Sequence, residues 1–106
     1  MTFYRDSRKR LSSVFAKGHA NRGVHGEDVV CAAVSGILQA AWVGLSDVAG
    51  VEVSGRAESG DLEMRWPEET RERVDVHAIV ATAEIAIEQI ARQEPDAVRC
   101  IARQEP

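Results

Sequence analysis

The sequence has no excess of basic residues, which weighs against a protein built to bind nucleic acid. Its 13 lysine and arginine residues are outnumbered by 17 aspartate and glutamate residues, so the net charge is −4 at pH 7. A surface that neutralises phosphates usually carries a clustered basic stripe. The one basic cluster, at 5–10, also contains Asp6 and Ser7 and is typical of a solvated hairpin turn. We therefore expect no direct contact with nucleic acid.

Long apolar runs are also lacking. Residues 1–17 hold no run that could form the core of a signal peptide, and no stretch approaches the roughly 20 apolar residues that span a bilayer. We therefore expect a cytoplasmic protein that does not enter a membrane. Since the chain has 106 residues, of which 44% are hydrophobic, we expect one domain over 1–106, and association with a second copy would support its small core.

Cysteine is scarce, and this excludes a disulfide framework. Cys31 and Cys100 are the only two, and cytoplasmic thiols are kept reduced, so we interpret both as free thiols. His19, His25 and Cys31 are spaced six residues apart, which is no standard zinc pattern. We therefore expect neither a metal nor a cofactor, and we interpret Cys100 as a small hydrophobic residue and His77 as a residue of a helix.

The sequence does contain clear secondary-structure patterns. Two short strands are predicted at 2–5 and 11–17, and two alternating segments at 51–58 and 61–66 predict a hairpin with Ser59-Gly60 as its turn. Apolar residues recur with helical spacing over 27–45 and from about 71 to 93, and Thr70 is a candidate cap of the second helix. The order β-β-α-β-β-α predicts an α+β fold in which an antiparallel sheet is covered by two helices.

Three further segments complete the pattern. Residues 18–26 contain three glycines and no apolar period, which predicts a flexible loop with His25 near the cleft. The helix at 27–45 is apolar nearly all round and is expected to be largely buried. Residues 97–102 are predicted to form a short edge strand. The hexapeptide Ile-Ala-Arg-Gln-Glu-Pro occurs at 90–95 and again at 101–106, which we interpret as a duplication without a function.

Cys31 and His19 are the candidate catalytic residues. Cys31 lies near the start of the first predicted helix, where unpaired backbone N–H groups and the helix dipole favour a thiolate. His19 lies 12 residues earlier, and the loop between them is long enough to bring its imidazole to the sulfur as a general base and acid. Such a pair suffices for acyl transfer. The commoner alternative is a buried, inert cysteine beside an exposed histidine.

Two motifs favour the catalytic interpretation. Gly-His-Ala at 18–20 and Gly-Glu-Asp-Val-Val-Cys-Ala-Ala-Val-Ser at 26–35 resemble the signature motifs of the ribosomal-processing cysteine protease (Prp) family, and so does their separation. The resemblance extends over essentially the whole chain. It implies a homodimeric cysteine peptidase that removes the N-terminal extension of large-subunit ribosomal protein twenty-seven, with Cys31 as nucleophile and His19 as catalytic histidine.

The resemblance also assigns supporting positions. Gly18 belongs to the histidine motif, and Asp28 and Ser35 match polar positions of the cysteine helix. At i−3 and i+4 from Cys31, both project from the helical face of the sulfur. The alternatives are that Asp28 is a first-turn acid favoured by the helix dipole and that Ser35 is a small packing residue.

A second class of function stays open on the sequence. The same fold could serve as a non-catalytic dimeric adaptor or a ribosome-assembly binding module. An apparent Cys31 pKa near the unperturbed value of about 8.5 would favour the adaptor. For the peptidase, we expect the loop at 20–26 to be mobile in the free enzyme and to become ordered over an extended substrate peptide.

Overall fold

The computed structural model describes residues 1–17, 25–58 and 61–106, and of residues 25–28 it describes only the backbone. The predicted turn Ser59-Gly60 and most of the predicted loop, including Gly18 and His19, therefore lie outside the described residues.

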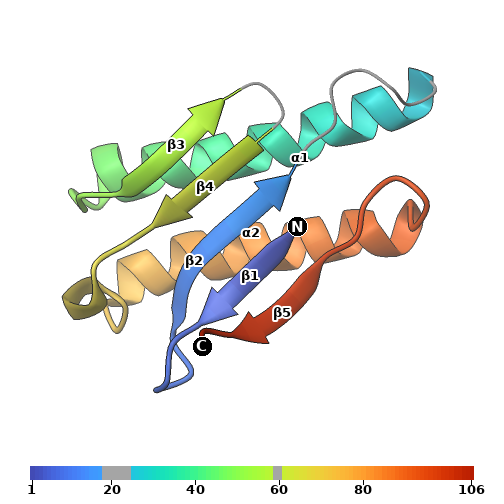
Figure 1. Ribbon diagram of the computed structural model, residues 1–106. Coiled ribbons are helices and arrows are strands. Elements are labelled where there is room, and N and C mark those ends of the chain that lie inside the picture. The colour runs from blue at the N-terminus through green and yellow to red at the C-terminus, as the bar shows by residue number, and fades with distance from the viewer. Residues whose placement is uncertain (18–24, 59–60) are drawn as a thin grey trace.

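One mixed, mostly antiparallel sheet of five strands forms the first layer (Figure 1). The strands are β1 (Thr2–Arg5), β2 (Leu11–Lys17), β3 (Ser54–Glu58), β4 (Asp61–Arg65) and β5 (Ile101–Gln104), in the spatial order β3-β4-β2-β1-β5. The two predicted hairpins are confirmed, and β2 joins them through antiparallel pairing with β4. β5 is the predicted edge strand, although it starts later than expected, and it pairs with β1 in parallel.

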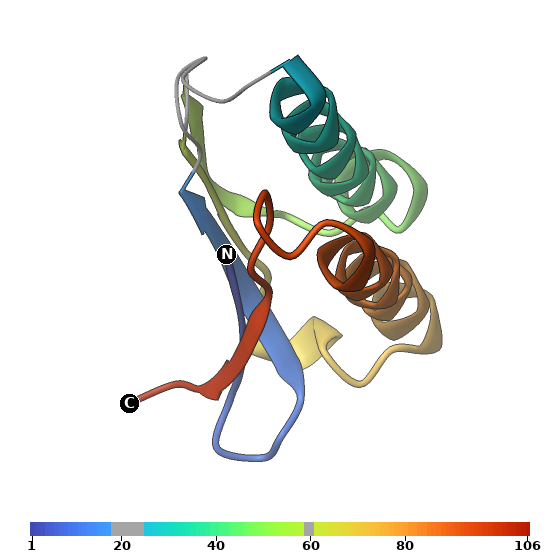
Figure 2. The same ribbon diagram turned by 90° about the vertical axis from the view of Figure 1, so that its right-hand side faces the viewer.

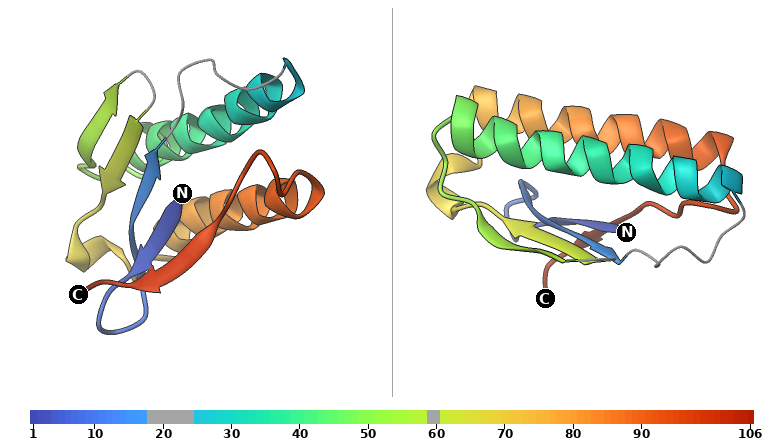
Figure 3. Two further views of the ribbon diagram at one scale, coloured as in Figure 1. Left: turned by 45° about the vertical axis from the view of Figure 1, so that its right-hand side comes forward. Right: turned by 90° about the horizontal axis from the view of Figure 1, so that it is seen from above.

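Two helices form the second layer. α1 (His25–Val43) and α2 (Val74–Gln93) lie side by side on one face of the sheet, as Figure 2 shows. α1 runs into a π-helical turn at Gly44–Val48, and a 3-10 turn at Glu68–Thr70 precedes α2. Among the described elements, none covers the other face of the sheet (Figure 3). The predicted α+β class is thus confirmed, with a fifth strand added after the second helix.

The core fills the space between the two layers. Alternation places Leu62 and Met64 of β4 inward, as predicted, next to Val14 and Trp66. The buried Trp66 side chain keeps a polar partner, because its Nε1 donates a hydrogen bond of 2.9 Å to the carbonyl oxygen of Leu11. The remaining core residues come from β1, β2, the two helices, the π-helical turn and the segment before β3: Phe3, Leu11, Val34, Leu38, Ala41, Leu45, Val51, Val76, Val80, Ala83 and Ile87.

α2 differs from its prediction at both its start and its buried face. The Thr70 hydroxyl donates to the carbonyl oxygen of Pro67, 2.7 Å away, so it does not cap α2, which begins after the extended residue Arg73. The apolar spacing from about 71 to 93 predicts one buried face made of Val76, Ile79, Ala83, Ala86 and Ile90. Instead, Val80 and Ile87 face the sheet, because α2 also packs against α1 and presents Ile79 and Ala86 to that second neighbour.

The turn between β1 and β2 has the exposed tip that the sequence predicts, at residues 7–9, but its first residue is buried. Asp6 is only 6% exposed, and its carboxylate accepts hydrogen bonds from Arg10 and from the buried Arg71 guanidinium. Burial alone would raise the pKa of Asp6, but these hydrogen bonds, together with that from the Arg8 backbone, lower it well below its usual range. The hydrogen bond between Asp6 and Arg71 thereby holds the turn against the segment that leads into α2.

α1 corrects two predictions. By length and composition, Val29–Val48 is apolar enough to cross a membrane, with a mean hydropathy of 1.8 over 20 residues, contrary to our expectation that no such stretch exists. The core helix of a soluble protein passes the same test, and α1 packs Val34 and Leu38 into the core. The prediction of a largely buried helix is also wrong, because Val29 and Val43 are more than half exposed.

The duplicated hexapeptide adopts two conformations. In its first copy, residues 90–93 form the last turn of α2, whereas residues 101–104 of the second copy are the strand β5. Hydrogen bonds from the Ile101 amide to the Met1 carbonyl and from the Glu105 amide to the Arg5 carbonyl bind the second copy to β1. Identical residues therefore form a helix or a strand according to their neighbours.

Candidate functional site

Cys31 is half-buried and lines a pocket of about 230 Å³ at one end of the molecule. In Figure 1 this is the end where β2 stops, α1 begins and the chain returns from α2 to β5. The pocket walls are mainly apolar and come from four segments of the chain: Met1, Ala16, Lys17, Cys31, Val34, Ala97, Val98 and Arg99. The structure thus makes the sulfur part of an accessible hollow.

The electrostatic support for a thiolate differs from the prediction. Because α1 begins at His25 rather than at Glu27, Cys31 is its seventh residue, at the end of the second turn. The helix dipole acts mainly within the first turn, so it helps Cys31 less than we predicted. Lys17 and Arg99 are the residues with charged side chains among those that line the pocket. Nearby cations favour the thiolate form of cysteine.

The partners predicted for Cys31 are only partly described. Gly18 and His19 lie outside the described residues, but Lys17, which precedes them in the chain, lines the pocket. The histidine motif therefore follows directly from a residue of the pocket wall. Asp28 lies in the second turn of α1 by its backbone, and its side chain is not described.

Ser35 lines a neighbouring hollow instead of the Cys31 pocket. This smaller pocket, of about 90 Å³, shares Ala16 and Val34 with the first. Ser35 thus lies along the same side of α1 as Cys31, in agreement with its i+4 spacing, but it does not line the pocket that holds the sulfur.

Arg99 and the segment 97–99 are the part of the site that the sequence analysis missed. No local sequence pattern predicts that these residues line the Cys31 pocket, because their position depends on how the chain turns back from α2 to β5. Lys17 could have been found, since it directly precedes the Gly-His-Ala motif.

Cys100 lies in a different environment, on the other side of Arg99. It is half-buried, packs against the core and lines a neighbouring hollow that contains Glu88 and Arg92 and shares Val98 and Arg99 with the Cys31 pocket. Burial and the nearby carboxylates of Glu88 and Glu84 raise the pKa of its thiol. These surroundings agree with the prediction of a small hydrophobic residue.

The remaining histidines belong to the two helices. His77 is an exposed residue of α2, as predicted, whereas His25 is the first residue of α1, so its prediction as a loop residue is wrong. Among the residues that the structure describes, no group of three histidine, cysteine, aspartate or glutamate residues could hold a metal ion.

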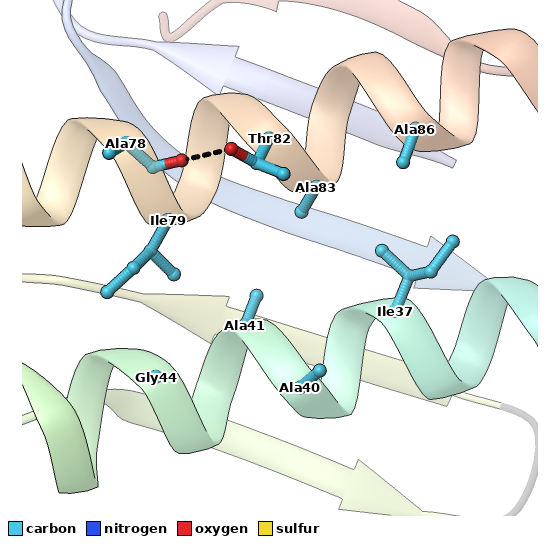
Figure 4. A pocket seen from close by; sticks show the side chains of 9 residues that line it. All are labelled: Ile37, Ala40, Ala41, Gly44, Ala78, Ile79, Thr82, Ala83 and Ala86. Carbon is cyan, nitrogen blue, oxygen red and sulfur yellow. Dashed lines mark hydrogen bonds between the residues drawn. The ribbon is translucent and has the colours of Figure 1, made fainter.

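A larger hollow lies between the helices and has a different character (Figure 4). This groove, which we call the helix groove, has a volume of about 540 Å³ and is lined by Ile37, Ala40, Ala41, Gly44, Ala78, Ile79, Thr82, Ala83 and Ala86. A Cβ atom on Gly44 would lie 3.2 Å from Cγ2 of Ile79, so this glycine permits the close approach of the π-helical turn after α1 to α2. Gly36 has no such neighbour. None of the lining side chains is titratable, so the groove offers apolar contact and no catalytic group.

Solved structures with the same fold are known from two bacteria. SMU.848 from Streptococcus mutans is 26% identical, with a TM-score of 0.86 over 98% of this chain and 92% of that chain. An essential ribosomal processing protease, Prp from S. aureus, in complex with a substrate peptide, is 16% identical, with a TM-score of 0.85 over 95% of both chains. The S. aureus protease with a covalently linked product peptide gives a TM-score of 0.76 at 17% identity over 95% of both chains.

No curated protein matches the chain. A family model does match, over residues 1–99, and its description is cysteine protease Prp. This match includes Cys31, the wall of its pocket and the first hairpin, together with both predicted motifs. Because it spans nearly all of the sequence, the chain belongs to the cysteine protease Prp family.

Proposed function

We propose that the protein is a cysteine peptidase in which Cys31 is the nucleophile and His19 is the general base and acid. The observation that carries this proposal is the position of Cys31 in an open pocket with Lys17 and Arg99 as its charged residues. Family membership supports it, and the His19 motif follows Lys17 directly in the chain. Gly18, Asp28 and Ser35 are proposed as supporting residues.

The proposed reaction has two steps. The Cys31 thiolate attacks the carbonyl carbon of the peptide bond, the C–N bond breaks, and the imidazolium of His19 gives its proton to the leaving amine. A thioester remains. His19 then takes a proton from water as the oxygen attacks the thioester, the C–S bond breaks, and the carboxylate product leaves. Lys17 and Arg99 favour the thiolate before each turnover.

The proposed substrate is the N-terminal extension of large-subunit ribosomal protein twenty-seven, cleaved in the cytoplasm. The S. aureus relative with this fold is a ribosomal processing protease that binds a substrate peptide. The apolar walls of the Cys31 pocket, formed by Val34, Ala97 and Val98, suit an apolar side chain next to the cleaved bond.

We test cleavage with the purified protein and the extended ribosomal protein, monitored by mass spectrometry. The Cys31→Ala and His19→Ala variants are expected to leave the substrate intact, while wild type releases one N-terminal peptide. Equal persistence of the substrate with wild type and Cys31→Ala would contradict the peptidase and favour the dimeric adaptor or assembly module.

We further propose a homodimer that buries the outer side of the two helices. The helix groove is apolar, and Val43, Val74 and Ile85 on the same helices are exposed, which leaves a large apolar surface in a single chain. A second copy would cover this surface and supply the burial that so small a core lacks.

Sedimentation velocity at micromolar concentration tests the dimer. We expect a dimer for wild type and for Ser7→Glu, which adds a charge to an exposed residue of the turn between β1 and β2 and lies on neither helix, and a monomer for Ala40→Glu inside the helix groove. A monomeric wild type would contradict the proposal.

A further inference from the structure

The Cys31 pocket and the smaller pocket beside it share two wall residues and follow one another along α1, and we call the two together the groove. Ala16 and Val34 line both pockets, and the α1 residues that line them follow one helical stripe: Cys31, Val34, Ser35, Leu38 and Gln39. A helix rises about 1.5 Å per residue, so Cys31 and Gln39 are about 12 Å apart along the axis. An extended peptide advances about 3.3 Å per residue, so the groove has room for about four residues beyond the sulfur.

The two ends of this groove carry opposite charges. At the Cys31 end the charged residues are Lys17 and Arg99, and at the other end they are Glu58 and Asp61. The sheet register places Glu58 directly opposite Asp61, and Asp61 opposite Lys17. Across the sheet, Glu58 of β3 and Asp61 of β4 are therefore negative. Lys17 of β2 and Arg99 of the segment 97–99 are positive.

The acidic end has an unbalanced charge. Like charges directly opposite each other on neighbouring strands repel, and Lys17 lies beside only one member of the Glu58–Asp61 pair. Glu58 is exposed, and it forms no salt bridge within the described ranges 1–17, 25–58 and 61–106. A cationic side chain of a bound peptide would offset this charge, whereas a cation near Arg99 would be repelled.

We propose that Glu58 is a specificity-determining residue and that the groove selects an extended peptide with a basic side chain about four residues from the bond at Cys31. This inference rests on the proposed peptidase function and adds the charge and position that the substrate requires. Since the charges are exposed, the effect on kcat/KM is expected to be about threefold per charge at low salt and smaller at high salt.

The experiment uses fluorogenic peptides that share one apolar cleavage site. A single Lys, Gln or Glu is placed four residues before the cleaved bond in one set and four residues after it in another. For wild type, we expect Lys to be preferred over Gln, and Gln over Glu, in one set only. Glu58→Lys should reverse that order, while Glu69→Lys, an equal change of net charge in the 3-10 turn before α2, should keep it.

Three outcomes overturn the inference: equal rates for the three residues in both sets, an order that Glu58→Lys leaves unchanged, or an order that Glu69→Lys reverses as well. Binding of the same peptides to Cys31→Ala, followed by fluorescence anisotropy, keeps the inference separate from the peptidase proposal. If wild type cleaves no peptide, the peptidase proposal fails, and the charge order in binding still decides the role of Glu58. Absence of both cleavage and binding overturns both.

Discussion

The two cysteines of this protein are both half-buried and lie on opposite sides of Arg99, yet their surroundings differ in the charges that favour or disfavour a thiolate. Cys31 shares its pocket with the cations Lys17 and Arg99, whereas Cys100 is near the carboxylates of Glu84 and Glu88, which together with burial raise the pKa of its thiol. Arg99 lines the hollows of both thiols and does not distinguish them. We therefore expect the carboxylates near Cys100 to make the difference in reactivity, because the thiolate is the nucleophile.

The largest expected difference between the two sites is in cleavage. Cys31→Ala should lower kcat/KM on the extended ribosomal protein by at least about a thousandfold, because the nucleophile is lost. Cys100→Ala is the matched control and should retain activity within about twofold. Equal losses in the two variants would mean that the distinction between the sites is wrong.

Alkylation is the next test. At pH 7 we expect Cys31 to react with iodoacetamide about tenfold faster than Cys100, because its cationic neighbours increase the thiolate fraction. Intact-mass spectrometry of Cys31→Ala and Cys100→Ala, each with one remaining thiol, gives the two rates over a pH series. Cys31 should titrate at a lower pH than Cys100, whose thiol pKa is raised by burial and by nearby carboxylates. If the order is reversed, the cationic pocket does not activate Cys31.

A smaller effect isolates the carboxylate contribution at Cys100. In a Cys31→Ala background, Glu88→Gln should lower the Cys100 pKa and speed its alkylation near pH 8 by about twofold to fourfold, because one negative charge is removed. Glu69→Gln, a change at an exposed residue remote from Cys100 in the chain, serves as the control. An unchanged rate in Glu88→Gln would leave burial and the Glu84 carboxylate as the causes of the raised pKa.

The smallest effect concerns stability. Cys100→Ala should lower the free energy of unfolding by no more than about 1 kcal/mol, since Cys100 is half-buried and packs only at the margin of the core. Urea denaturation with an unchanged m value measures this. A loss several times larger would give Cys100 a structural importance that its surroundings do not indicate.

Local sequence patterns predict much of this fold, but of the residues around the Cys31 pocket they predict Cys31 and not Arg99. Alternation at Leu62 and Met64 determines which face of β4 is buried, and the two motifs identify Cys31 without any structure. The sequence could not show that Val80, rather than Ile79, faces the sheet, because that depends on how α2 divides its contacts between two neighbours. Nor could it place Arg99 beside Cys31, since a connection between a helix and an edge strand brings them together.

The duplicated hexapeptide shows that the edge strand β5 places few constraints on its own sequence. β5 is held by main-chain hydrogen bonds to β1, and three of its four side chains are exposed, so the strand residues themselves are under few constraints, whereas Glu105, which follows them, bonds to Ser12 and Arg65. An outermost strand of this kind tolerates replacement by unrelated residues other than proline at its bonded amides. Copying a gene segment that encodes a helix end could therefore add an edge strand to the sheet in one step. Sequence divergence in β5 would then say little about divergence around the Cys31 pocket.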